Sequence, residues 1–233
     1  MTPHILLTNP NSSEATSAMM HAIAETALSG RLTVQTVTAR RAPAMIVTPE
    51  QLAASAAEVV ELGTAHGRAH GRDCAGIIVS AFGDPGLAEL RRKVAIPVAG
   101  ICEAPMIEAS QGGRRFGVAT STPDLIEAIG QRAHDLGLAH LYTGIRCTAG
   151  DPMALALDRA LLTEALSGAV GDCITLDDAQ AVIIGGGPLS EAAEALRARF
   201  DKPVLGPIPS AVERIIGLIG EAAHVPQHMH QPW

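Results

Sequence analysis

Aromatic side chains make up only 2% of this 233-residue chain, with one Trp, one Tyr and three Phe. Proteins that bind single-stranded nucleic acid stack the bases on aromatic side chains, so this scarcity argues against such a partner. A long basic run is also missing, and the net charge of −7 opposes binding to nucleic acid or to an anionic membrane. The core must therefore be built from Ala, Val, Ile and Leu.

Other absences concern membranes and disulfides. No apolar run reaches the roughly 18 residues of a membrane-spanning helix. The start of the chain, MTPHILLTNPN, lacks the basic segment typical of a signal peptide. The four cysteines, Cys74, Cys102, Cys147 and Cys173, are widely spaced and form no CxxC pair. We therefore expect a reduced cytoplasmic protein.

Short runs of Val, Ile, Leu and Ala alternate with longer segments of helical pattern. Near-continuous apolar runs are typical of parallel strands that are buried on both faces. The predicted strands are 4–8, 32–37, 76–80, 97–101, 116–120, 141–145, 181–184 and 203–205. This alternation predicts a doubly wound α/β fold, whose ligands bind beyond the carboxyl ends of the strands.

Cap residues mark the predicted helix starts. Thr48-Pro49-Glu50-Gln51 has the form of a capping box with proline at the first helical position. Similar signals are Asn11 with Glu14, Asp84-Pro85, Thr122-Pro123, Asp151-Pro152, and Ser210 with Glu213. Because helix N-termini carry free N–H groups, such positions also favour anionic ligands.

The chain contains an internal repeat. GIIVSAFGDPGLAELRRKVAIPVAGI (76–101) and AVIIGGGPLSEAAEALRARFDKPVLGPI (181–208) both consist of a strand, a Gly/Pro turn, a helix ending in basic residues, and Pro-Val-x-Gly. More weakly, ILLTNPNSS (5–13) echoes GVATSTPDL (117–125). Repeats on this scale predict two similar lobes that face each other.

We expect one lobe to comprise residues 1–97 with 207–233, and the other residues 98–206. Ala81 and Gly186 match in the repeat, so they would lie on opposite sides of one cleft.

Four motifs carry a resemblance to a known family. They are NPNSS after the first strand, AFGDPGL after the third, GICEA after the next, and the late Gly-rich turn. Together they resemble the aspartate/glutamate/hydantoin racemase superfamily, nearest to its hydantoin and allantoin racemases, over nearly the whole chain. The resemblance implies two Rossmann-like lobes with parallel sheets related by a pseudo-twofold axis. It also implies an oligomeric enzyme that acts on a small molecule with neither cofactor nor metal.

In the active racemases, the resemblance implies one cysteine at each of two mirrored strand ends. One thiolate removes the α-proton from one face, and the other thiol returns a proton to the opposite face. Such a weakly acidic proton needs a well-placed base and N–H donors for the enolate oxygen. The matching positions are Ala81 and, in the late turn, about Gly186, so both cysteines are missing here.

Three explanations are possible for the missing thiols. The first, which we favour, is a natural branch with altered chemistry. The second is an engineered Cys→Ala change at Ala81. The third is a site that binds without reacting. We accordingly expect an enzyme that acts at a carbon alpha to a carbonyl of a small carboxylate, hydantoin or ureido compound. The alternatives are a decarboxylase, lyase or hydrolase on a similar substrate, and a disabled racemase or small-molecule binder.

Two side chains are the candidate acid–base groups. Glu103 matches a glutamate of the family at a strand end facing the cleft, and burial would raise its pKa toward neutrality. The alternative is a salt-bridged or capping carboxylate. Ser80 could act as a nucleophile, although the simpler interpretation is that it bonds the backbone at the strand end. Asp84 is most simply a helix cap. Of Cys102 and Glu103, at most one should face the ligand, because strand neighbours point to opposite faces.

The resemblance also implies that loops after the mirrored strands hold the carboxylate or imide oxygens of the ligand. The residues concerned are Asn9, Asn11, Ser12, Ser13, Phe82, Thr120, Ser121, Thr122, Gly187 and Pro188. The polar ones among them could also serve only as helix caps, which is compatible with ligand binding.

Metal and dinucleotide motifs are weak. GGGPLS does not fit the GxGxxG spacing. His66 and His70 lie four residues apart near a predicted helix end, but a third ligand is not evident, so we expect solvated side chains. The tail 224–233, with His224, His228 and His230, is expected to be loose, and metal binding there would be adventitious.

Overall fold

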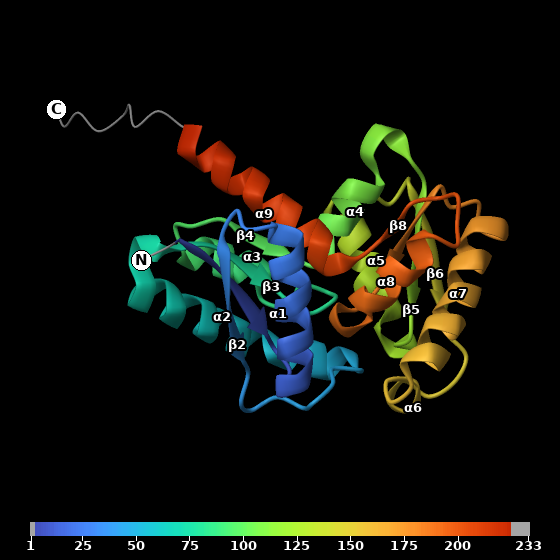
Figure 1. Ribbon diagram of the computed structural model, residues 1–233, viewed down its shortest axis with the longest axis horizontal. Coiled ribbons are helices and arrows are strands. Elements are labelled where there is room, and N and C mark those ends of the chain that lie inside the picture. The colour runs from blue at the N-terminus through green and yellow to red at the C-terminus, as the bar shows by residue number, and fades with distance from the viewer. Residues whose placement is uncertain (1–2, 225–233) are drawn as a thin grey trace.

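The computed structural model describes residues 3–224 and contains two parallel four-stranded sheets flanked by helices (Figure 1). The strand orders are β2-β1-β3-β4 and β6-β5-β7-β8, so the two sheets have the same topology. Each predicted strand is present, with its ends shifted by no more than two residues. The strands are β1 (His4–Asn9), β2 (Thr33–Thr38), β3 (Cys74–Val79), β4 (Val98–Gly100), β5 (Phe116–Thr120), β6 (Tyr142–Cys147), β7 (Ala181–Ile184) and β8 (Val204–Leu205).

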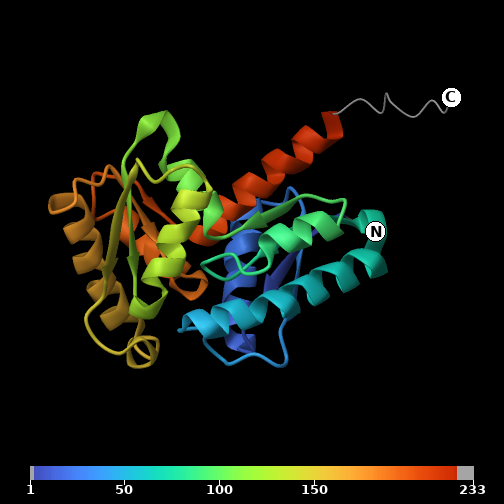
Figure 2. The ribbon, with the colours of Figure 1, turned by 180° about the vertical axis from the view of Figure 1, so that it is seen from behind.

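Helices pack on both faces of each sheet, as the two opposite views show (Figures 1 and 2). In the first sheet α1 and α9 pack on one face, and α2 and α3 on the other. In the second sheet α7 and α8 share one face, and α4 and α5 the other. The helices are α1 (Glu14–Leu28), α2 (Pro49–His70), α3 (Leu87–Lys93), α4 (Glu103–Ala109), α5 (Ile126–Asp135), α6 (Pro152–Leu155), α7 (Arg159–Thr175), α8 (Ser190–Arg197) and α9 (Pro207–His224).

One buried apolar cluster joins the two sheets. It contains Leu7 and Ile78 from the first sheet and Val118 and Ile183 from the second. Burial of such aliphatic side chains is the main favourable term in folding, so the two sheets stabilise each other. Within residues 3–224, no helix is long and apolar enough to cross a membrane.

The lobe boundary expected at residue 97 lies inside the first sheet, because β4 (Val98–Gly100) pairs with β3. The final helix α9 packs against β3 and β4. Residues 225–233 of the expected first lobe, including His228 and His230, lie outside the described residues. His224 ends α9, although it was expected to belong to the loose tail.

Two predicted caps are confirmed by hydrogen bonds. The Thr48 side chain accepts from the Gln51 N–H, and the Gln51 side chain accepts from the Thr48 N–H, which completes the capping box. Asp151 accepts from the Ala154 N–H at 2.8 Å.

Other predicted caps are wrong or absent. Ser13, not Asn11, caps α1, because Asn11 Oδ1 is bonded within its own loop. Ser210 lies inside α9, which already begins at Pro207. Thr122 makes no side-chain cap and precedes a 3-10 turn. The error at α1 arises because a polar loop side chain has several hydrogen-bonding groups within reach, here the Asn9 amide and the Ser13 N–H.

Candidate functional site

A cavity of about 510 Å³ lies where the loops that follow β1, β3, β5 and β7 meet. Its uncharged polar lining comes from Asn11, Ser13, Thr16, Ser80, Ser121 and Thr122. Its apolar lining includes Met19, Met45, Ile46, Leu52, Phe82, Leu125, Met153, Leu157 and Leu162. A site beyond the carboxyl ends of parallel strands is the arrangement expected for α/β sheets, and its size suits a small molecule.

Ala81 and Gly186 line this cavity from turns in different lobes. Ala81 follows β3 and Gly186 follows β7, and these strands hold the same place in the two sheet orders. Among the described residues, the backbone N–H groups of Ala81, Phe82 and Gly187 have no hydrogen-bond partner. Free N–H donors beside a cavity can hold an oxyanion.

Two asparagines in the loop after β1 have different roles. Asn9 is fully buried, and its Nδ2 donates to Asn11 Oδ1 and to Ser17 Oγ, both at 2.9 Å. Asn11 Oδ1 also accepts the Ser13 N–H at 2.9 Å, so Asn11 Nδ2 remains without a partner among the described residues. Asn9 therefore positions the loop, while Asn11 and Ser13 line the cavity. Ser12 does not line it.

The loop after β5 shows a similar division. Thr120 is fully buried, and its Oγ1 donates to the Gly185 carbonyl at 2.7 Å. That bond ties the end of β5 to the turn after β7. Ser121 and Thr122 line the cavity, together with Gly187 and Pro188. Thr120 itself does not.

Ser80 reaches the cavity but has no base beside it. Its Oγ lies 3.5 Å from the Ile78 carbonyl, at the limit of a hydrogen bond. No imidazole or carboxylate within the described part of the chain bonds this hydroxyl. The nucleophile–base contact that activates a serine is therefore missing.

Glu103 does not line the cavity, contrary to the expectation that it faces the cleft. It is the first residue of α4, and its side chain is 3% exposed. The Arg91 guanidinium binds this carboxylate, and Arg132 Nη2 lies 3.4 Å from Glu103 Oε2. Because the chain turns into α4 directly after β4, Glu103 points toward Arg91 at the end of α3. Its geometry is that of the salt-bridged alternative.

Asp84 caps α4, although it was expected to cap the helix that follows it. Its carboxylate accepts the N–H groups of Cys102 and Glu103 at 2.8 Å each, and Arg132 Nη2 lies 3.4 Å away. Burial, followed by the charge of Glu103, raises the pKa of Asp84 to about 7. Asp84, Arg91, Glu103 and Arg132 form what we call the buried ion cluster.

None of the cysteines lines the cavity within residues 3–224. Cys102 is fully buried directly before α4, and burial raises the pKa of its thiol well above the ordinary value. Cys74 and Cys173 are also buried, and Cys147 is half-buried. A neutral, enclosed thiol is a poor nucleophile and a poor base.

The sequence interpretation missed the two charged side chains of the cavity. Arg159 begins α7, Glu191 lies in the first turn of α8, and Arg159 Nη2 is 2.8 Å from Glu191 Oε2. Among the described lining residues, no other side chain carries an acidic or basic group. The signal for Glu191 was its position directly after the Gly-rich turn.

These features define a class of protein: an α/β chain with a small-molecule cavity between two sheets of equal topology. The sequence profile of the family described as Asp/Glu/Hydantoin racemase matches residues 5–215. The chain therefore belongs to the Asp/Glu/hydantoin racemase family of enzymes, which confirms the resemblance drawn from the four motifs.

Its relatives match it along most of their length. The chain is 28% identical to the hydantoin racemase of Rhizobium meliloti, over 93% of this chain and 89% of that protein. It is 23% identical to the hydantoin racemase of Paenarthrobacter aurescens, over 89% and 87%. The solved allantoin racemase of Klebsiella pneumoniae has a TM-score of 0.88 and 25% identity, covering 95% of this chain and 89% of that one.

Proposed function

We propose that this enzyme acts at the carbon alpha to a carbonyl of a small carboxylate, hydantoin or ureido compound, without the usual pair of cysteines. One observation carries the proposal. Two topologically equivalent turns, residues 80–82 and 185–187, line the same cavity. The hydantoin and allantoin racemases that the chain resembles support this substrate class.

The polar lining suits the oxygen atoms of such a substrate. Asn11 Nδ2 and the hydroxyl group of Ser121 can donate to a carboxylate or imide. The free N–H groups of Ala81 and Gly187 can stabilise the enolate oxygen that forms when the α-proton leaves. The apolar lining favours a substrate with an apolar substituent.

Glu191 is the base that we assign to the reaction, because it is the carboxylate among the described lining residues. In this step the substrate C–H bond breaks, the proton passes to a Glu191 oxygen, and the electron pair moves onto the carbonyl oxygen as an enolate. Among the lining residues that the structure describes, no second carboxylate, imidazole or thiol is present, so a proton reaches the opposite face only from water. Exchange of the α-proton should therefore be faster than inversion.

The test follows mass and chirality in heavy water. The panel contains 5-substituted hydantoins, allantoin, aspartate, glutamate and substituted malonates. We expect deuterium at the α-carbon to accumulate faster than the opposite enantiomer. Glu191→Gln should slow exchange by about 100-fold or more, the contribution of a general base. Glu194→Gln, on the exposed side of the same helix, is the matched control. A product of changed mass would instead support the decarboxylase, lyase or hydrolase alternative.

A second candidate function, binding without reaction, is favoured by two observations: no cysteine among residues 3–224 lines the cavity, and Arg159 and Glu191 form an ion pair. The double variant Ala81→Cys/Gly186→Cys tests it. Gly186 has extended backbone with φ 167°, and the three atoms nearest to a Cβ there all belong to the Leu189 side chain, at 3.0 Å or more. An inert parent that binds a substrate measurably by calorimetry, with exchange appearing only in the double variant, would establish a disabled racemase site.

A further inference from the structure

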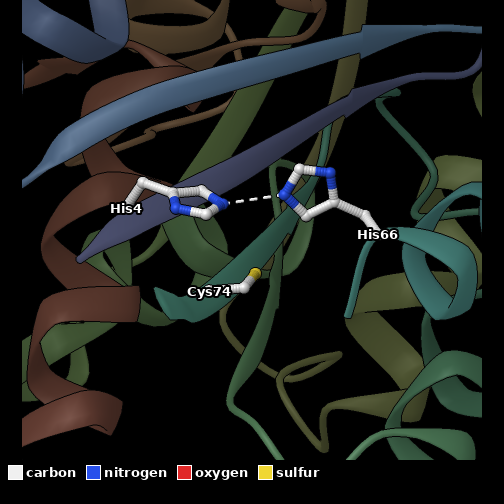
Figure 3. Close-up of side chains that lie close together, drawn as sticks. All are labelled: His4, His66 and Cys74. Atoms are coloured by element: carbon white, nitrogen blue, oxygen red, sulfur yellow. Dashed lines mark hydrogen bonds between the residues drawn. The ribbon is translucent and has the colours of Figure 1, made fainter. Parts of the chain in front are cut away.

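Two histidines and a cysteine lie close together (Figure 3). They lie at the amino ends of the strands of the first sheet, whereas the cavity lies at the carboxyl ends. His4 begins β1, Cys74 begins β3, and His66 lies near the end of α2. Their ligand atoms all lie within 4.8 Å of one another. The cavity adjoins the carboxyl ends of the same strands, so this cluster is separate from the proposed active site.

The cluster is enclosed. His4 and Cys74 are 2% and 1% exposed, and His66 is half-buried. Figure 3 shows the Cys74 sulfur directed toward the gap between the two imidazoles, whose Nε2 atoms are 2.7 Å apart. The His70 ring stacks on His66 with centroids 4.1 Å apart and closes one side. The solvated histidines expected from the sequence are thus partly enclosed.

The two imidazole rings share one hydrogen bond, between their Nε2 atoms. Burial lowers the pKa of His4, and burial with neighbouring His70 lowers the pKa of His66 to about 4. Neutral imidazoles offer nitrogen lone pairs, and one of these now accepts the N–H of the other ring. Burial raises the pKa of the Cys74 thiol, so the thiol keeps its proton until a metal displaces it.

We propose that His4, His66 and Cys74 bind one Zn²⁺ ion at the amino ends of β1 and β3. Two imidazole nitrogens and a thiolate are ligands that Zn²⁺ takes in tetrahedral sites, and water can occupy the fourth position on the half-buried side. Nitrogens bound to one tetrahedral Zn²⁺ are about 3.3 Å apart, so the two rings must separate by about 0.6 Å. His66 lies on a helix surface and can make that adjustment. The ion would tie α2 to β1 and β3.

The test uses the full-length, untagged protein after treatment with a chelator, and Co²⁺ as a spectroscopic probe. We expect one Co²⁺ per chain, a thiolate-to-cobalt charge-transfer band in the near ultraviolet, and loss of that band when Zn²⁺ is added. His66→Ala should weaken Zn²⁺ binding by more than about 100-fold, beyond what loss of an outer-shell partner costs. Cys74→Ser should abolish the band.

Matched controls separate this site from other ligands. His140→Ala and Cys147→Ser change an exposed histidine and a half-buried cysteine away from the cluster, and they should leave binding unchanged. His66→Ala keeps the test decisive if Cys74→Ser fails to fold. Absence of binding, a spectrum without the thiolate band, or binding that survives His66→Ala and is lost in His228→Ala/His230→Ala would each overturn the proposal.

Discussion

The turns after β3 and β7 hold the same place in two sheets of equal topology, yet they are built differently. The β3 turn is anchored by a buried carboxylate, because Asp84 accepts two N–H groups at the start of α4. The β7 turn is built from glycine. A Cβ at Gly185 would lie 2.7 Å from Val118 Cγ1, and one at Gly187 would lie 2.6 Å from Met20 Sδ. One topology therefore accepts a buried charge in one lobe and close apolar packing in the other.

A pair of arginines repeats the pattern. Arg91 at the end of α3 and Arg197 at the end of α8 each donate from Nε to the carbonyl of the next strand, at Val98 and Val204, with 3.1 Å in both cases. Arg91 also binds the buried Glu103. The second partner of Arg197 is Glu194, whose side chain is 77% exposed. The backbone contact is common to both arginines, whereas only Arg91 has a buried carboxylate as its second partner.

The largest effect should come from Asp84→Ala, with Asp178→Ala as its control. Both aspartates have left-handed backbone, φ 52° and 54°, so alanine brings similar strain to either position. At pH 8, Asp84→Ala should lower the free energy of unfolding by about 3–5 kcal/mol more than Asp178→Ala, because it leaves two buried N–H groups without an acceptor and removes a charge partner of Arg132. Urea unfolding measures the difference. Equal losses would mean that the buried ion cluster contributes nothing beyond backbone strain.

The same carboxyl group predicts a pH dependence. Its pKa is about 7 in the folded protein and 3.8 as an ordinary value. The folded state therefore keeps a proton that the unfolded chain releases, and stability should fall as pH rises from about 4 to about 7, by up to about 1.4 kcal/mol per pH unit. Asp84→Asn should flatten this slope, whereas Asp178→Asn should retain it. Unfolding curves at several pH values measure this slope. A slope that persists in Asp84→Asn would contradict the assignment of the pH dependence to Asp84.

Arg91→Met and Arg197→Met compare the two lobes directly. Loss of Arg91 removes a charge partner from the buried Glu103 and should cost about 3 kcal/mol. Loss of Arg197 removes a backbone contact and an exposed ion pair and should cost about 1 kcal/mol or less. Denaturant unfolding of both variants measures the two losses in the free energy of unfolding. Similar losses would contradict the proposed difference between the two arginines.

The smallest effect concerns the β7 turn. Gly185→Ala should destabilise by about 1–3 kcal/mol, because its Cβ meets Val118, Thr120 and Phe82 within 3.3 Å. Gly186→Ala should change stability by about 0.5 kcal/mol or less, since the atoms nearest to its Cβ belong to the flexible Leu189 side chain. Thermal melting ranks the two, and a Gly186→Ala variant as unstable as Gly185→Ala would mean that position 186 cannot hold a thiol either.

Local pattern was enough to predict the strands, the parallel α/β class and the repeat. Apolar runs of strand length and Thr48-Pro49 at a helix start are signals carried by neighbouring residues. The motifs NPNSS and AFGDPGL likewise sufficed for the family. The site was harder. Asn11, Ser121 and Ala81 line the cavity as the sequence suggested, but Arg159 and Glu191, in the first turns of α7 and α8, were not predicted.

The sequence by itself determined the order of strands and helices, the duplicated plan and the family, because these depend on short-range patterns. Only the tertiary structure decided which charges are buried and what they bind. Asp84 caps a helix 18 residues further along the chain, and Glu103 lies against Arg91 instead of the cavity. His4 meets His66 across 62 residues of sequence. Burial and ionisation depend on which distant segments pack together, so they emerge only when the chain has folded.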